Sequence, residues 1–158
     1  MFTLDQRLQD DSHIIGRFSL SLLLLSKDAN YPWLILVPER EDVFELFHLS
    51  RDDRAQLMRE SCHLADVMTS ILDADKINVA ALGNVVPQLH LHHIARYRND
   101  PAWPAPIWGK VPAKAYDSEQ LQALVAKLTN ALSGEGFEAI ALGSVYTPTG
   151  ISSPKIDC

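Results

Sequence analysis

Hydrophobic residues gather in short runs over the first part of the chain, and polar breaks separate these runs. The run FSLSLLLLS, residues 18–26, predicts a largely buried strand, and WLILVPE, residues 33–39, predicts a second strand that Pro38 closes. The segment between them, residues 27–32, contains Asp, Asn and Pro, which are typical of turns. The two strands are therefore expected to pair as a hairpin or to lie as close neighbours.

Two longer segments place apolar residues at helical spacing. The first follows Ser50, has Asp53 three residues on as in a capping box, and ends near residues 73–76. The second spans roughly residues 118–133 and stops at Gly134. The apolar face of the first helix consists of Leu57, Leu64, Ala65, Met68, Ile71 and Leu72.

Three further segments predict strands: residues 77–82, residues 88–95 and residues 137–146. Residues 99–116 hold several prolines and two tryptophans and predict an ordered but irregular loop, whereas the tail of residues 147–158 is expected to be loosely ordered. Strands and helices thus follow each other as two strands, a helix, two strands and a helix. This order predicts an α+β fold, mainly an antiparallel sheet of about five strands with two helices packed on one face.

Length and composition bound the class of protein. A chain of 158 residues suits a single domain, here with a core at about residues 18–116 and a C-terminal helix and tail at residues 117–158. The net charge of −6 argues against sequence-independent nucleic-acid binding, which depends on clustered Lys and Arg, but leaves room for a small anionic ligand. Two distant cysteines, a polar N-terminus and no long apolar run predict a cytoplasmic protein that does not span a membrane.

Three of the six histidines lie within four residues, in the segment PQLHLHHIARYR, residues 87–98. Because side chains alternate on a strand, Gln88, His90 and His92 are expected on one face. The other face is expected to belong to the core under the helices, and it carries Leu89, Leu91 and His93. The first face is therefore a polar row that needs water, a ligand or protein partners.

Three interpretations of this polar row remain open from the residues alone. The row can be an exposed sheet face with solvated imidazoles. His90 and His92, two positions apart, can also chelate a metal ion, although a structural zinc site needs four ligands and no cysteine lies nearby. In the third interpretation, one neutral imidazole attacks phosphorus and its neighbour donates to the phosphate oxygens, which requires ring nitrogens on the same face.

The segment QLHLHHI, residues 88–94, resembles the motif of the histidine triad (HIT) superfamily, His-φ-His-φ-His-φ-φ, where φ is apolar. The earlier strand with ILVPERE and the helix of about 20 residues between the two segments follow the order of that family. The resemblance extends from about Phe18 to about Trp108. It implies a HIT-like fold and a nucleotide hydrolase or transferase that needs no cofactor and is typically a homodimer.

The resemblance also implies roles for the motif residues. His90 takes the middle position and would be the nucleophile that attacks the α-phosphorus of a nucleotide conjugate and forms a nucleotidyl-histidine. His92 takes the third position and would contact the phosphate oxygens. The first position departs from the family motif, because Gln88 replaces a histidine there and cannot titrate. A binding protein that has kept the fold and lost efficient turnover is therefore an alternative function, as is a metal-binding module through His90 and His92.

Four further residues are candidates for nucleotide binding. The family's Asn-x-Gly…Gly-Gln loop before the motif is replaced here by LGNVVPQ, in which Asn84 is the best candidate for the phosphate-side Asn, at a shorter spacing. Asp28 and Asn30 stand in the turn where the family places an acidic residue that binds the ribose hydroxyls. A turn residue that caps its own backbone is an equal explanation for Asp28. Trp108 is expected either to stack on a base or to pack within its loop. Arg96 is expected to reach a phosphate or to form an exposed salt bridge.

Overall fold

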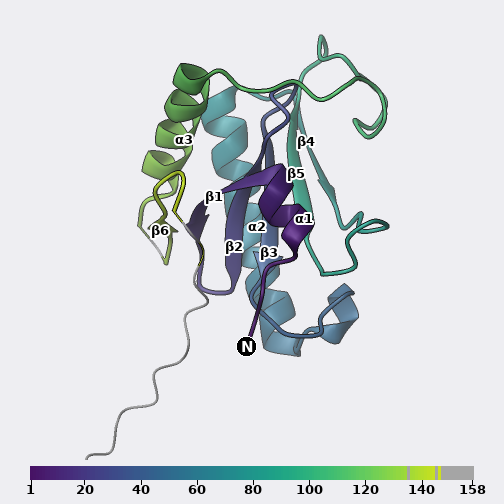
Figure 1. Cartoon of the computed structure of the whole chain (residues 1–158), viewed down its shortest axis with the longest axis vertical. Coiled ribbons are helices and arrows are strands. Elements are labelled where there is room, and N and C mark those ends of the chain that lie inside the picture. The colour runs from purple at the N-terminus through teal and green to yellow at the C-terminus, as the bar shows by residue number, and fades with distance from the viewer. Residues whose placement is uncertain (135, 145, 147–158) are drawn as a thin grey trace, which may run out of the picture.

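The computed structural model describes residues 1–134, 136–144 and 146, and within these residues six strands form one antiparallel sheet in the order β4-β5-β3-β2-β1-β6 (Figure 1). The strands are β1 (Ser12–Arg17), β2 (Ser21–Ser26), β3 (Trp33–Pro38), β4 (Lys76–Ala80), β5 (Leu91–Arg96) and β6 (Glu138–Ala139). The helices are α1 (Gln6–Asp11), the short 3₁₀ helix η1 (Leu46–His48), α2 (Arg51–Leu72) and α3 (Ser118–Leu132). The predicted α+β class, the antiparallel sheet and the adjacent pairing of β2 with β3 are confirmed.

The sheet lies between two layers. Helices α2 and α3 cover one face, and the N-terminal segment with α1 crosses the other (Figure 1). The Leu run of β2 serves both layers because its side chains alternate: Leu23 and Leu25 join the core under the helices, and Leu22 and Leu24 join the core under the N-terminal segment. In the described part of the chain, no helix combines the length and the apolar character that a bilayer crossing needs.

Helix α2 forms as its sequence predicts. The hydroxyl oxygen of Ser50 accepts a hydrogen bond from the backbone N–H of Asp53 at 3.1 Å, which satisfies one of the free donors at the start of the helix. The helix ends at Asp73, which adopts a left-handed conformation with φ of 51°. Its predicted apolar face packs on the sheet, where Leu57, Leu64 and Met68 are fully buried.

Two elements were missed, and two of the predicted strands needed correction. Residues 1–17 carry α1 and β1, neither of which the sequence predicted. β5 begins at Leu91 and not at residue 88, so the first half of the histidine segment is irregular. Among the described residues of the strand predicted over 137–146, β6 is limited to Glu138–Ala139, which pair with Arg17 and Gly16 of β1. The tail of residues 147–158 lies outside the described residues.

The loop of residues 99–116 is irregular as predicted, and Arg96 anchors it from inside the protein. The Arg96 side chain is 2% exposed, and its Nε lies 2.7 Å from Oδ2 of Asp100, whose side chain is 4% exposed. Its Nη1 donates to the side-chain oxygen of Asn78 at 2.7 Å, and its Nη2 donates to the carbonyl of Ala105 at 2.9 Å. The expectation of an exposed ion pair or a phosphate contact is therefore wrong, because protein groups surround the guanidinium.

Candidate functional site

A pocket of about 470 Å³ opens on the face of the sheet that α2 and α3 leave uncovered. The middle of the sheet supplies its floor, the segment of residues 82–86 and the loop with Trp108 supply two walls, and α1 supplies another. Both His90 and His92 line it, as the expected same-face row requires. The lining side chains of the β-strands and of the histidine segment are Ser12, Ser26, Trp33, Ile35, His90 and His92.

His90 presents one free ring nitrogen to this pocket. Its Nδ1 lies 2.7 Å from the backbone carbonyl oxygen of Gln88. A carbonyl can only accept, so Nδ1 carries the proton and Nε2 keeps its lone pair. In the described part of the chain Nε2 has no hydrogen-bond partner, and it is not among the buried polar atoms that lack one. In the neutral form of a ring held in this way, Nε2 is the nitrogen whose lone pair is available to a ligand.

His92 is bound by protein groups at both ring nitrogens. The indole N–H of Trp33, which can only donate, donates to Nδ1 at 3.0 Å. The proton therefore sits on Nε2, which donates to the carbonyl of Leu82 at 3.0 Å. The ring packs edge-on against His90 with centroids 4.7 Å apart. For His92 to contact a phosphate oxygen, its Nε2–H would have to leave the Leu82 carbonyl.

Burial keeps the second and third histidines of the segment neutral. It lowers the pKa of His92 from 6.5 to about 4, against the opposing effect of the Leu82 carbonyl and with a smaller contribution from the nearby His90. His93 is fully buried on the helix side of the sheet, where its Nε2 lies 2.7 Å from the hydroxyl of Ser61, and burial likewise lowers its pKa to about 4. The alternation that the sequence predicted for His92 and His93 is confirmed.

These two lowered pKa values predict a loss of stability in mild acid. Between about pH 6.5 and pH 4 the unfolded chain binds protons at His92 and His93 and the folded chain does not, so the free energy of unfolding falls as pH decreases through this window. At about pH 5 we expect a loss of about 1 to 2 kcal/mol for each imidazole relative to pH 7. Urea unfolding at the two pH values measures it. A midpoint that does not move with pH would contradict the prediction.

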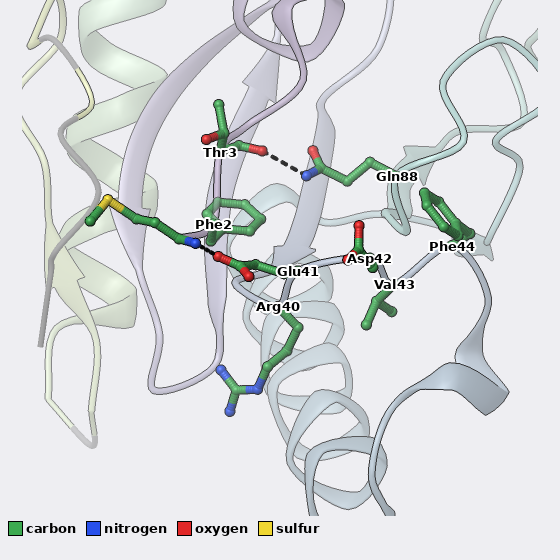
Figure 2. A pocket seen from close by; sticks show the side chains of 9 residues that line it. Phe2, Thr3, Arg40, Glu41, Asp42, Val43, Phe44 and Gln88 are labelled. Atoms are coloured by element: carbon green, nitrogen blue, oxygen red, sulfur yellow. Dashed lines mark hydrogen bonds and ion pairs between the residues drawn. The ribbon is translucent and has the colours of Figure 1, made fainter.

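Gln88, in contrast, turns away from the two histidines. Its side-chain Nε2 donates to the carbonyl of Thr3 and its Oε1 accepts from the backbone N–H of Asp5, both at 2.9 Å. Figure 2 shows the amide directed to Thr3 at the edge of a neighbouring pocket of about 360 Å³. Only the backbone of Gln88, through its contact with His90, takes part in the arrangement of the histidines.

Asn84 and Trp108 both line this pocket, and Trp108 also packs against the cluster around Ala102 and Ile107 in its own loop. Asn84 is exposed and lines the pocket beside His90. The Trp108 ring meets the His92 ring edge-on at a centroid distance of 5.3 Å. Gly83 lets the intervening segment pass close to His90, since a Cβ there would lie 2.8 Å from the Val86 carbonyl oxygen and 3.4 Å from Cε1 of His90.

Asp28 and Asn30 are not brought to the pocket. Oδ1 of Asp28 accepts from the backbone and side-chain N–H groups of Asn30 and from the backbone N–H of Lys114. The Asn30 amide also donates to the carbonyl of Pro112 at 2.8 Å. The turn therefore uses these polar groups to fasten the loop around residue 113, which is the capping role weighed in the sequence.

Comparison with known proteins agrees with this geometry. The model of the HIT domain matches residues 7–99. The chain belongs to the HIT family. Histidine triad proteins of known structure from Marinobacter aquaeolei and Bradyrhizobium japonicum are 47% and 45% identical, each with a TM-score of 0.81. The alignments cover 84% and 82% of this chain and 96% and 97% of those chains, respectively. A search of curated proteins finds no match.

A zinc-bound HIT protein from Mycobacterium smegmatis, 19% identical over 74% of this chain and 84% of that chain, has a TM-score of 0.54 and shows the shared fold only. In the described part of this chain, no group of three or more His, Cys, Asp or Glu side chains is placed to hold a metal ion. Both nitrogens of His92 are also engaged by Trp33 and Leu82. The metal interpretation of His90 and His92 thus lacks a third ligand among these residues.

The sequence did not point to three residues of this HIT pocket. Trp33 fixes the tautomer of His92, and its place on β3 two residues before Ile35 gave a signal, because alternation puts both on the pocket face. Ser26 lies at the end of β2 and is 7% exposed. Arg7 belongs to α1, and a helix of six residues is too short to show a recognisable periodic pattern in the sequence.

Proposed function

We propose that this HIT protein is a nucleotide hydrolase or transferase that acts at the α-phosphorus of a nucleotide conjugate through a nucleotidyl-His90 intermediate. Family membership supports the class of activity. The observation that carries the finer proposal is the His90 ring, whose Nδ1–H is held by a backbone carbonyl and whose Nε2 is left with a free lone pair at the pocket.

In the first step the Nε2 lone pair of His90 forms a bond to the α-phosphorus, and the bond from phosphorus to the leaving group breaks. The leaving group departs with the bonding pair and takes a proton from water. The imidazole keeps its Nδ1–H and becomes cationic, and the Gln88 carbonyl that accepts this N–H at 2.7 Å stabilises the charge. In the second step water attacks phosphorus, releases a proton, and the bonding pair returns to Nε2.

The pocket around His90 suits a nucleoside. Trp33 and Trp108 meet at a centroid distance of 6.0 Å and an interplanar angle of 88°, and with the neighbouring aliphatic side chains they give the walls an apolar character. Aromatic side chains bind a base by stacking on its ring, which does not distinguish one base from another by its hydrogen-bonding groups. Asn84 lies beside His90 and is proposed to donate its amide to the phosphate, and His92 is proposed to position the His90 ring and to reach phosphate when the Leu82 carbonyl moves.

Incubation with adenosine 5′-phosphoramidate tests this proposal. A quench that avoids acid, followed by intact mass spectrometry, should show a protein carrying one adenylyl group, and free AMP should accumulate in parallel. Peptide mapping should place the adduct on His90. AMP release without any adduct at His90 under single-turnover conditions would contradict the covalent route.

A second function, nucleotide binding without turnover, has one observation in its favour. The side chain of Gln88 binds the backbone of Thr3 and Asp5 instead of facing the His90 pocket. The first motif position therefore supplies no side chain that could donate a proton to the leaving group. Tight AMP binding, with neither adduct nor release from any conjugate tested, would favour this function over hydrolysis.

Assembly and location belong to the same proposal. The HIT resemblance supports a homodimer, and we propose one that works without a cofactor, in the cytoplasm, on a small nucleotide ligand. Light scattering coupled to size-exclusion chromatography gives the mass of the particle directly, and a monomeric mass over the working concentration range would remove the dimer from the proposal.

A further inference from the structure

The side chain at the first motif position grips the backbone of a distant segment. The side-chain amide N–H of Gln88 donates to the Thr3 carbonyl (Figure 2). Its amide oxygen accepts from the backbone N–H of Asp5, so one carboxamide binds a backbone acceptor and a backbone donor two residues apart. The two nitrogens of an imidazole point in diverging directions and cannot make both contacts from the same place. The replacement of His by Gln therefore comes with a specific contact that a histidine would not supply.

The gripped segment is part of the folded core. Phe2, Leu4 and Leu8 are 9%, 1% and 6% exposed, and they pack with β2, β3 and Val86 on the pocket side of the sheet. The segment enters α1 immediately after the clamp, since the side chain of Asp5 caps the helix by accepting from the backbone N–H of Arg7. The contact with Gln88 thus fixes the start of α1, and with it the direction in which α1 presents its side chains.

One of those side chains is the exposed cation Arg7, which has no side-chain partner among the residues that the structure describes. Among the described residues that line the pocket with His90, Arg7 is the only cation and Asp11 the only carboxylate. In that part of the chain, no ion pair and no side-chain hydrogen bond includes the Arg7 guanidinium. A reaction at His90 brings a phosphate anion into the pocket, and a guanidinium is well suited to bind it or an anionic leaving group.

We propose that Arg7 binds an anionic group of the substrate and that Gln88 is the residue that positions Arg7, by clamping the backbone at Thr3 and Asp5. This inference rests on the proposed function. It assigns the first motif position a role in substrate binding that acts through the N-terminal segment, away from the phosphate itself.

A double-mutant cycle tests the coupling. Arg7→Gln removes the cation, Gln88→Met removes both clamp contacts at similar volume, and the third variant carries both changes. AMP affinity is read from the quenching of tryptophan fluorescence, and KM and kcat are measured with adenosine 5′-phosphoramidate. Each single variant should raise the AMP Kd and KM about five- to tenfold with kcat changed less than about threefold. The AMP Kd of the double variant should exceed the higher of the two single-variant Kd values by no more than about twofold.

Control variants and the salt dependence of AMP binding distinguish this coupling from a general loss of structure. Arg7→Lys should recover most of the affinity, and the matched surface change Arg51→Gln should leave it unchanged. The advantage of wild type over Arg7→Gln should shrink as salt rises from about 0.05 to about 0.5 M, and Gln88→Met should show the same reduced salt dependence as Arg7→Gln. Gln88→Glu, which keeps the acceptor for Asp5 and loses the donor for Thr3, gives an intermediate variant if Gln88→Met unfolds.

Each outcome decides a different point. Unchanged AMP affinity in Arg7→Gln, or losses that multiply in the double variant, overturns this inference and leaves the proposed function standing. Coupled losses of AMP affinity in a protein without any adduct support the inference and overturn only the catalytic part of the proposed function. A wild-type protein that binds no AMP and releases none overturns both.

Discussion

His90→Ala is expected to lower the rate of AMP release from adenosine 5′-phosphoramidate by at least about 1,000-fold, because the variant lacks the only atom proposed to bond to phosphorus. The adenylyl adduct should disappear from the mass spectrum together with the activity. AMP should still bind within a few-fold of the wild-type affinity, since the aromatic walls and Asn84 are unchanged. Steady-state release, adduct mass and AMP binding are measured on the same preparations.

The matched control is His63→Ala. His63 is also an imidazole, but it is exposed, belongs to α2 and contacts Phe18 on the helix side of the sheet. Its variant should release AMP at the wild-type rate. A His90→Ala protein that is as active as wild type would remove His90 as the nucleophile and would direct attention to a mechanism with direct attack by water.

Arg96→Ala is expected to lower the free energy of unfolding by about 3 to 5 kcal/mol, because it leaves the Asp100 carboxylate buried without its partner. Burial by itself would raise the pKa of Asp100, but hydrogen bonds from Arg96 and from the backbone N–H groups of Tyr97, Ala102 and Trp103 hold it at about 2. The carboxylate is thus charged in the folded protein. Without the guanidinium, the folded state carries the free-energy cost of a buried charge that has no cationic partner. Urea or guanidinium unfolding at neutral pH measures the loss.

Arg98→Ala provides the comparison for this effect, since Arg98 lies two residues further along the chain with an 81% exposed side chain, and its Nε is 3.7 Å from Asp75. An exposed pair of this kind contributes at most about 1 kcal/mol. Equal losses in the two variants would show that burial of the Arg96–Asp100 pair does not govern its contribution.

The parts of the fold that the sequence predicted are those with strong local signals. The capping pair Ser50 and Asp53 marked the start of α2, and alternation placed His92 and His93 on opposite faces of β5. The family motif is equally local, so His90 could be proposed as the nucleophile without knowledge of the fold, and that role stays a prediction. The confirmed elements share one property: residues close in the chain determine them.

The missed features depend on contacts between distant residues. The sequence around Arg96 does not indicate that Asn78 and the loop around Asp100 enclose its guanidinium. α1 is only six residues long and is stabilised by its packing on the sheet more than by its own sequence. The direction of the Gln88 side chain depends on Thr3, 85 residues earlier, and no periodicity along the chain records such a contact.

Gln88 contacts His90 through its main chain and the N-terminal segment through its side chain. Its main-chain carbonyl contacts Nδ1 of His90 and so selects the tautomer of the neutral ring, and every amino acid supplies that carbonyl. Its side chain reaches the N-terminal segment, and there the amide is specific. A substitution at this position can therefore change the pocket wall that α1 supplies while the orientation of the His90 ring stays the same. Such a division makes the first motif position a site where substrate preference can change in evolution, or by design, independently of the chemical step.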